Sequence, residues 1–490
     1  MRRDVAALAA VPHDLLVVGG GIYGVTAAYE AARRGLAVAL VEAVDFGAGA
    51  SWNSLKTIHG GLRHLQRLDL RSHRESVRER RTLLRIAPAI VRPLPFLVPA
   101  YGHGPRGREV LAAGLILSDL LSLDRNRGLP AARHLPPARM LSRNDTLARV
   151  PGLRAHGLAG GALFFDAQVD SSERLTIAFL RSATSAGAQA ANHCEVIALR
   201  REGARVMGAR VRDRESGREH DLTARVVLNA AGPGASRLLE GAGLARSLGP
   251  LLMAQNLVFD ARWPLPERLA VGARTGGRFL FLVPWRDRIL AGTDYWPAEE
   301  RRGPEGVARF RDEVAEAFPW ASLGAARIAL VHRGLVPGEG GAEGLAPRPL
   351  LRDHETADGL AGLITLLGVK YTTARAVAER AVLLACRKLG RPGAEISPPG
   401  EPLPWARLLE GPFAEQARVA VREEMAGTLA DAVLRRLDLG TAGPAGDAEV
   451  AAVAAVMAQE LGWDEGRVAA ERAALARFYE DAYNGREAIP

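Results

Sequence analysis

Apolar runs separated by glycine mark the first regular segments of the chain. Residues 14–18 are rich in Leu and Val, a glycine-rich turn follows, and an alanine-rich stretch with helical character runs to Arg34. Gly35 ends that helix, and a second apolar run covers residues 36–41. Short continuous apolar runs of this kind are typical of buried strands in a parallel sheet. The pattern predicts a strand, a helix and a second strand, in the order of a dinucleotide-binding fold.

The turn after the first strand has the spacing of a dinucleotide site, because it reads Gly19-Gly20-Gly21-Ile22-Tyr23-Gly24. Gly19 permits the tight turn, Gly21 lets a pyrophosphate approach the backbone, and Gly24 lets the helix pack closely on the strand. Glu42 lies at the tip of the second strand, where a carboxylate accepts both ribose hydroxyls. Glycines alone could serve only a structural turn, but strand, helix, strand and acid together favour dinucleotide binding.

The spacing does not separate FAD from NAD, since both cofactors use this unit. After Glu42 the chain continues through two stretches of small and polar residues, 45–51 and 54–65. Such a segment is suited to following an extended cofactor. It therefore favours FAD.

Later runs extend the same pattern. Residues 226–232 form a strand whose small residues, Ala230, Ala231 and Gly232, let the backbone approach a dinucleotide, although an ordinary strand-to-helix turn is the alternative. An apolar strand at 363–369 leads through Lys370 into an alanine-rich helix. Its place between strand and helix suits a cofactor site better than a surface lysine. Thr293 and Asp294 follow an apolar strand at 289–291, where a turn is the alternative reading.

The elements predict an α/β protein with a Rossmann-like FAD-binding domain built on a parallel sheet, an antiparallel β-rich substrate domain and a C-terminal helical domain. A Pro- and Gly-rich stretch at 391–404 is expected to be a linker, and the last segment has helical apolar spacing. We expect the FAD-binding domain to be discontinuous. The expected extents are 1–100, 160–250 and 335–390 for the FAD-binding domain, 101–159 and 251–334 for the substrate domain, and 400–490 for the helical domain.

Composition fits a globular protein that exceeds one hydrophobic core. The chain has 490 residues, 48% hydrophobic and 24% charged, with a formal net charge of +9. The charge favours a small anionic substrate or an anionic surface. The most basic segment, 71–85, lacks the interleaved aromatic residues that stack bases, so no nucleic-acid partner is expected. The two cysteines fit no metal-ligand spacing, so we expect no metal site and a cytoplasmic location.

No run reaches the roughly 20 apolar residues that span a bilayer. The longest candidate, 110–123, is expected to be a buried helix, with an amphipathic patch on the inner face of a membrane as the alternative. Peripheral membrane contact and a homodimer are both left open.

Motifs along nearly the whole chain resemble the FAD-dependent glycerol-3-phosphate dehydrogenases, within the D-amino-acid-oxidase-like superfamily. The most specific is the run from Ser54 to Leu65, which includes His59-Gly60-Gly61-Leu62-Arg63-His64. Further matches are Phe281-Leu282-Val283-Pro284-Trp285, Gly292-Thr293-Asp294, Arg352-Asp353-His354, Gly368-Val369-Lys370-Tyr371-Thr372-Thr373, residues 422–428 and Arg435-Arg436.

The resemblance implies a noncovalent FAD, oxidation of glycerol 3-phosphate to the ketone by hydride transfer to flavin N5, and electron transfer to quinone, oxygen or another acceptor. By position it places Arg63, Arg352, Lys370 and the Thr293 hydroxyl in the substrate pocket, and Val196 against the adenine. Arginine forks and a lysine charge hold a phosphate well. The cofactor contacts that we expect from turn and resemblance together are Gly19, Gly21, Ile22, Tyr23, Gly24, Glu42, Ser51, Ser54, Lys56, His59, Gly60, Gly61, Val196, Ala230, Ala231, Gly232, Lys370, Tyr371 and Thr372.

Two departures from the family pattern bear on the substrate. The chain has Val336 where the family has a phosphate-facing arginine, and His64 where the family has tyrosine. Losing one charge-assisted contact costs about 1.5 to 3 kcal/mol, unless Arg333 or Arg348 supplies the fork. An amine or amino-acid oxidase, or a flavin-binding protein without turnover, therefore stays an alternative.

The reaction needs a base for the hydroxyl proton, and the sequence offers His64 or Lys370. Histidine accepts a proton near neutral pH, whereas lysine first needs its pKa lowered by burial or by neighbouring arginines.

Overall fold

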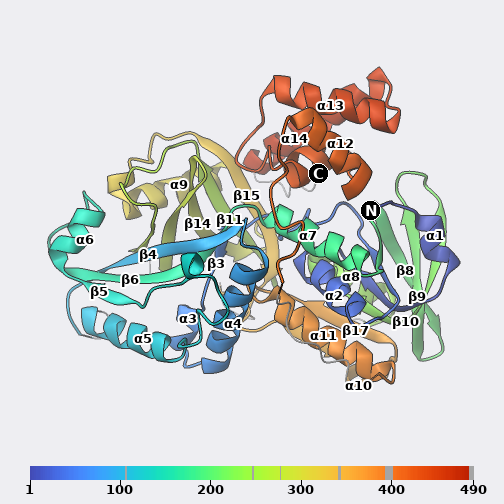
Figure 1. Cartoon of the computed structure of the whole chain (residues 1–490), viewed down its shortest axis with the longest axis horizontal. Helices are drawn as coiled ribbons and strands as arrows, with labels where there is room; N and C mark the ends of the chain where they lie inside the picture. Colours follow the sequence, from blue (N-terminus) through green and yellow to red (C-terminus); the bar gives the residue numbers. More distant parts are fainter. Residues whose placement is uncertain (105–106, 245–247, 276–277, 340–343, 392–400, 485–490) are drawn as a thin grey trace.

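The computed structural model describes residues 1–104, 107–244, 248–275, 278–339, 344–391 and 401–484. It contains two large sheets side by side, with a helical C-terminal part above their junction (Figure 1). Residues 392–400 of the expected linker, and residues 400 and 485–490 of the expected helical domain, lie outside the described ranges.

The first sheet is the dinucleotide-binding sheet. Its strands are ordered β16 (Leu350–Asp353), β17 (Leu363–Leu367), β10 (Glu219–Asn229), β1 (His13–Val18), β2 (Val38–Val41) and β7 (Gln189–Ala191). The pairs from β17 to β7 are parallel, and β16 pairs antiparallel at the edge. Two further strands, β8 (Cys194–Glu202) and β9 (Arg205–Asp213), extend β10 as an antiparallel ribbon.

One helical layer covers this sheet. The helices α2 (Ile22–Ala32), α7 (Ser172–Ser185) and α11 (Ala374–Lys388) pack against one another and share a core with β1, β2 and β17. The predicted strand, helix, strand order at the N-terminus is therefore present as β1, α2 and β2. Because parallel strands end at one edge, the loops after β1, β2, β10 and β17 meet there.

The second sheet is mainly antiparallel. Its order is β15 (Ile328–Pro337), β11 (Leu251–Phe259), β14 (Arg288–Pro297), β13 (Arg278–Trp285), β12 (Ala270–Thr275), β4 (Val91–Tyr101), β6 (Leu158–Val169) and β3 (Thr57–Ile58), with β5 (Arg139–Leu141) beside β6. Helix α9 (Pro304–Ala317) contributes Val307, Phe310 and Val314 to the core on this sheet. The α/β class with a second antiparallel sheet is confirmed.

The sheet assignment differs from the expected segments at three strands. β3, β4 and β6 pair in the second sheet, although residues 57–58, 91–100 and 160–169 were grouped with the FAD-binding segments. Both sheets offer a buried face, so an apolar run does not reveal which one it joins. The extents of the domains stay a prediction.

The remaining helices lie around these sheets. They are α1 (Val5–Ala10), α3 (Leu62–Leu65), α4 (Leu70–Ile86), α5 (Arg108–Leu120), α6 (Arg143–Arg149), α8 (Ala235–Gly241), α10 (His354–Asp358), α12 (Phe413–Glu424), α13 (Asp447–Leu461), α14 (Glu465–Asn484) and a π-helical turn (Asp431–Arg436). The last four form the expected helical C-terminal part.

Helix α5 was expected to be buried, and this expectation is wrong. Leu115 is its one buried residue, whereas Val110, Ile116 and Leu120 are exposed, as is Leu123 beyond its end. An apolar run cannot distinguish a core helix from a surface helix with one wide apolar face. None of the helices in the described ranges combines the length and apolar character needed to cross a membrane.

Candidate active site

The glycine turn between β1 and α2 has room for backbone and for nothing larger. A Cβ on Gly24 would lie 1.8 Å from the Gly19 carbonyl oxygen, and one on Gly19 would lie 2.5 Å from that of Ala230. Gly19 also has a φ of 104°, which favours glycine. The close packing predicted from the motif is therefore present.

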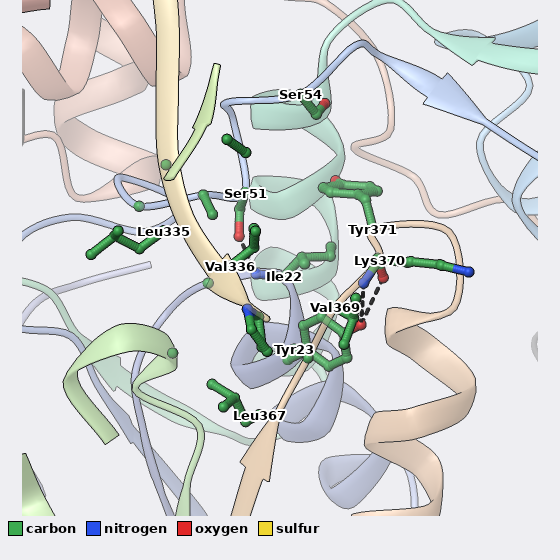
Figure 2. Close-up of a pocket in the computed structure, with 18 of the residues that line it drawn as sticks. Ile22, Tyr23, Ser51, Ser54, Leu335, Val336, Leu367, Val369, Lys370 and Tyr371 are labelled. Atoms are coloured by element: carbon green, nitrogen blue, oxygen red, sulfur yellow. Dashed lines mark hydrogen bonds between the residues drawn. The ribbon is translucent and has the colours of Figure 1, made fainter. Parts of the chain in front are cut away.

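The start of α2 faces the cavity beside Ser51. The Ile22 N–H donates to Ser51 Oγ at 2.9 Å, and Figure 2 shows the two residues next to each other. A helix N-terminus that lines a cavity, next to a hydroxyl, suits a phosphate group.

Glu42 is held by the turn that it serves. Its carboxylate accepts from the Gly20 N–H at 2.6 Å and from the Val44 N–H at 2.9 Å, and it lines the cavity. Burial raises the pKa of Glu42, although these two hydrogen bonds oppose the shift. Four acceptor positions on a carboxylate leave room for ribose hydroxyls as well.

One cavity of about 2150 Å³ connects the edge of the first sheet to the second sheet. It exceeds the ~300 to 1,000 Å³ of an ordinary small-ligand pocket, which fits a dinucleotide together with a substrate. Predicted residues that line it are Gly19, Gly21, Ile22, Tyr23, Glu42, Ser51, Ser54, His59, Gly61, Arg63, His64, Val196, Ala230, Ala231, Gly232, Thr293, Lys370, Tyr371 and Thr372.

Tyr23 ties the start of α2 to the loop after β17. Its hydroxyl donates to the Lys370 carbonyl oxygen at 2.7 Å and accepts from the Lys370 N–H at 3.1 Å, as the dashed lines in Figure 2 show. Burial raises the pKa of Tyr23 to about 12. The backbone of Lys370 is thus fixed by the glycine turn.

The side chains of Lys370 and His64 form a pair, with 2.7 Å between Lys370 Nζ and His64 Nε2. Burial and the nearby Arg63 lower the pKa of Lys370 to about 8. Burial and the Lys370 charge lower the pKa of His64 to about 4. At neutral pH the ammonium therefore donates to a neutral imidazole.

His59, Tyr371 and Thr372 form the wall next to this pair. The His59 N–H donates to Thr372 Oγ1 at 3.2 Å, and the Tyr371 hydroxyl donates to the Ser172 carbonyl oxygen at 2.8 Å. Burial and Lys370 lower the pKa of His59 to about 3, so this imidazole is neutral.

Thr293 lies within β14, so the alternative of a turn at this position is wrong. Its hydroxyl donates to Asn256 Oδ1 at 2.7 Å, and both residues line the cavity. β14 begins at Arg288 and ends at Pro297, so the apolar run at 289–291 marks only its first part.

Four predicted site residues do not line this cavity. Gly24 is one of them, and it packs against the Gly19 carbonyl instead. Lys56 is fully buried, and its Nζ donates to Glu173 at 2.6 Å and to Ser172 Oγ at 2.9 Å. Arg352 is bound in a bidentate ion pair with Asp358. Gly60 donates its N–H to Asp166 at 2.6 Å. Lys56 and Gly60 bind residues 117 and 106 positions away, and Arg352 binds Asp358, six positions further on. The motifs do not include these partners, so they do not predict the contacts.

At position 336 the cavity is lined by an uncharged side chain. Val336 lines the cavity, and so do Arg333 and Arg348. Arg333 is buried, and its guanidinium is already hydrogen-bonded within the protein. Its Nε and Nη2 donate to Gln255 Oε1, and its Nη1 donates to the Arg302 carbonyl oxygen. Residues 333 and 336 also point to opposite faces of β15. Arg348 is exposed and lies 3.4 Å from Asp69, so its fork is the more available one.

Several lining residues were not predicted, among them Asn53, Asn256, Arg278 and Tyr295. The Asn53 side-chain oxygen is buried without a partner in the described part of the chain, which fits a group supplied by a ligand. Asn256 had a signal in the sequence, because it stands next to Gln255 in the otherwise apolar run of β11. The other residues had none.

The glycine turn, the acid after β2 and the small residues after β10 define a dinucleotide-binding oxidoreductase fold whose cavity fits FAD. The family model of FAD dependent oxidoreductases matches residues 14–383, and that of the C-terminal domain of alpha-glycerophosphate oxidase matches residues 409–468. The chain therefore belongs to the FAD-dependent oxidoreductase family, with FAD as its cofactor.

Named relatives agree with this placement. The chain is 35% identical to a glycerol-3-phosphate dehydrogenase of Mycobacterium leprae over 75% of its own length and 62% of that protein, and 33% identical to one of Synechocystis over 80% and 73%. The matched region thus spans less than two thirds of the mycobacterial enzyme.

Solved structures show the same fold. The glycerol-3-phosphate dehydrogenase from Bacillus halodurans complexed with FAD superposes with a TM-score of 0.72 at 22% identity, covering 98% of this chain and 97% of that chain. The L-proline dehydrogenase from P. horikoshii superposes with a TM-score of 0.60 at 17% identity, covering 77% and 94%.

Proposed function

We propose that this chain oxidises the secondary alcohol of glycerol 3-phosphate, or of a related small anionic alcohol, to the ketone, and passes the electrons to quinone or another acceptor. The observation that carries the proposal is the pair of Lys370 and His64 at 2.7 Å, next to Arg63, in the cavity that holds the dinucleotide. The named relatives support the choice of substrate.

The residues along the edge of the first sheet would hold FAD. The glycine turn and the start of α2 at Ile22 would hold the diphosphate, Glu42 would hold the ribose, and Val196 would contact the adenine. Ala230, Ala231 and Gly232 would let the backbone approach the cofactor, and Tyr371 and Thr372 would contact it on the side of the reacting groups. When bound, FAD supplies the hydride-accepting chemistry.

Lys370 takes the hydroxyl proton when its amine is neutral. Its pKa of about 8 lies close to neutral pH, where a general base is most efficient, while the pKa of His64 of about 4 makes the imidazole a poor base. His64 Nε2 accepts from the lysine and holds Nζ in place. The proton moves from the substrate oxygen to Nζ as the carbonyl forms.

Arg63 and Arg348 bind the anionic group of the substrate. Both line the cavity, and their exposure allows the guanidinium groups to adjust to a phosphate. Thr293 is held by Asn256 and presents its hydroxyl oxygen to a substrate hydroxyl. These contacts orient the alcohol carbon toward the flavin.

Oxidation of an amine or amino acid is the second candidate, and Val336 is the observation that favours it. The arginine absent at this position removes part of the phosphate recognition that the family uses. Solved relatives of similar fold include a glycine oxidase from Bacillus cereus, with a TM-score of 0.56 at 18% identity.

An anaerobic substrate screen tests the two candidates. Glycerol 3-phosphate is expected to bleach the flavin absorbance of the purified protein, and glycine, proline and simple amines are expected to leave it unchanged. Lys370→Met should bind FAD with an unchanged spectrum and bleach far more slowly. Bleaching by an amine alone would overturn the proposal, and no bleaching by any substrate would favour a flavin-binding protein without turnover.

The exposed face of α5 supports a peripheral membrane contact, through which a quinone would reach the protein. Ile116 and Leu120 on α5 are exposed. Leu68, between α3 and α4, and Leu70, the first residue of α4, are exposed as well, and α3 packs against both α4 and α5. Sedimentation with vesicles containing anionic lipid should carry the protein down, and the variant with both Ile116→Glu and Leu120→Glu should stay in solution. Equal sedimentation of both proteins would exclude this face.

A further inference from the structure

A buried carboxylate next to the ribose position is bound by the C-terminal part of the chain. Asp45 accepts from Arg436 Nη2 at 2.7 Å and Nη1 at 2.8 Å, from Arg435 Nε, and from Asn192 Nδ2 at 2.9 Å. Asp45 stands three positions after Glu42. Although burial opposes ionisation, the two arginines hold the pKa of Asp45 far below its usual range.

The same π-helical turn reaches the other wall of this end of the cavity. Asp431 pairs with His193 Nε2 at 2.8 Å and with Arg435 Nη2 at 2.8 Å. His193 precedes β8, whose first residues line the cavity up to Ala198. Burial of His193 lowers its pKa, but the Asp431 carboxylate outweighs this effect and raises the pKa of His193.

The two walls are also joined to each other. The His193 N–H donates to the Val44 carbonyl oxygen at 2.7 Å, and the Cys194 N–H donates to that of Glu42 at 2.8 Å. The loop after β2 and the start of β8 are therefore hydrogen-bonded to each other. Residues 431–436 bind both segments, through Asp45 in the loop and through His193 before β8. In Figure 1 the helices of this C-terminal part lie above the junction of the two sheets.

Stability alone does not account for so many buried charges. Arg435, Arg436, Asp45 and Asp431 are all at most 1% exposed. Apolar side chains of similar volume usually hold two parts together at least as well, because buried ions lose their hydration. Directional hydrogen bonds do what apolar contacts cannot, since they fix the position of each backbone segment.

We infer that the C-terminal part positions the adenosine half of FAD, with Arg435, Arg436 and Asp431 as positioning residues that act through Asp45 and His193. The C-terminal part is then a cofactor-retention element. This inference rests on the proposed place of the ribose at Glu42 and of the adenine at Val196.

Dissecting the ligand tests the inference. In Arg436→Gln apoprotein, the dissociation constants of FAD and of ADP are expected to rise by the same factor, about tenfold, while that of FMN, which lacks the adenosine, stays unchanged. Arg422→Gln is the matched control, because Arg422 pairs with Glu460 on the surface of the same C-terminal part. Its affinities for all three ligands should equal those of the wild type.

Several outcomes would overturn the inference. Unchanged ADP affinity in folded Arg436→Gln contradicts it, and so does an equal loss of FMN affinity, which a general loss of structure would produce. If Arg436→Gln does not fold, His193→Ala replaces it, since that side chain is 12% exposed, and the same pattern is expected at about threefold. No change in ADP affinity in His193→Ala would then contradict the inference.

A further variant separates this inference from the proposed function. Glu42→Ala should weaken ADP on its own, because the carboxylate touches the ribose. If it does not, the place of the adenosine is wrong. If Glu42→Ala weakens ADP and the Arg436 and His193 variants do not, only the positioning role fails.

Discussion

The two ends of the cofactor cavity differ in how their charged groups are paired. At the ribose end, Asp45 is fully buried and Glu42 is partly buried, and their carboxylates bind arginines and backbone N–H groups that other segments hold in place. At the substrate end, Arg63 is exposed, His64 is about half-buried, and Lys370 has a neutral imidazole as its partner.

The difference follows from what each end has to do. A cofactor that stays bound gains from fixed groups with satisfied charges, because the cost of ordering them is met when the protein folds. A base needs the reverse, since a carboxylate partner would raise the lysine pKa and stop it from accepting a proton near neutral pH. Strong ion pairs would therefore help to retain FAD, whereas Lys370 has no ion-pair partner among the described residues and can act as a base.

The largest expected effect is at the substrate end. Lys370→Met should lower kcat/KM about 1,000-fold, because the base is lost, with FAD content unchanged. Stopped-flow reduction of the flavin measures it, and His64→Asn is the companion variant, with a smaller loss expected. Normal turnover in Lys370→Met would remove the lysine from its role.

A loss of stability comes next, at the boundary between the two ends. Lys56→Met should destabilise the fold by about 3 kcal/mol, because Glu173 is left as an unpaired buried charge. Urea unfolding measures the loss, and the double variant Lys56→Met with Glu173→Met should be more stable than Lys56→Met alone. If Lys56→Met instead weakens FAD without destabilising the protein, Lys56 contacts the cofactor after all.

The ribose end should tolerate no added methyl group in its turn. Gly24→Ala is expected to raise the dissociation constant of FAD about 100-fold, because the new Cβ collides with the Gly19 carbonyl and displaces the turn. Fluorescence titration of apoprotein with FAD measures it. Gly114→Ala, which adds a methyl in open space on α5, is the control and should bind FAD normally.

The pH dependence of flavin reduction distinguishes the two candidate bases. Lys370 acts when neutral, and its pKa is about 8, so kcat/KM should fall about tenfold per unit as the pH drops below 8 and level off above it. If His64 were the base, its pKa of about 4 would give a flat profile from about pH 5 to 9.

The smallest expected effect is a gain. Val336→Arg should lower the KM for glycerol 3-phosphate about tenfold, because it adds a charge-assisted contact in the cavity wall. Steady-state kinetics measures it, and Leu335→Arg, which adds a charge at the neighbouring lining position, shows whether the gain depends on the position. A loss of activity on this substrate, together with activity on another, would show that the valine belongs to a different specificity.

Local patterns in the sequence predicted the geometry of the glycine turn. Gly19 and Gly24 allow close backbone packing there, and the Glu42 carboxylate binds the Gly20 N–H of the same turn, so neighbours in sequence are enough to place them. Their roles in binding FAD stay a prediction. The parallel arrangement of β1, β2, β10 and β17 follows from the same apolar runs.

The residues that were misplaced depend on distant partners. Lys56 stands in a cofactor motif, yet its charge is paired with Glu173, 117 positions away. Asn256 and Tyr295 line the cavity because β11 and β14 pair in the second sheet, which no local pattern reveals. The apolar run of helix α5 predicts a core helix, but a run of this kind does not show whether another layer of the protein covers it.

The hydroxyl of Tyr23 joins the glycine turn to the backbone of Lys370, and this link restricts how the protein can change. A substitution that shifts the start of α2 to accept another nucleotide also moves the lysine amine relative to the substrate. A change in cofactor preference is therefore expected to change turnover as well, and a redesign of the nucleotide site would have to restore the position of Lys370.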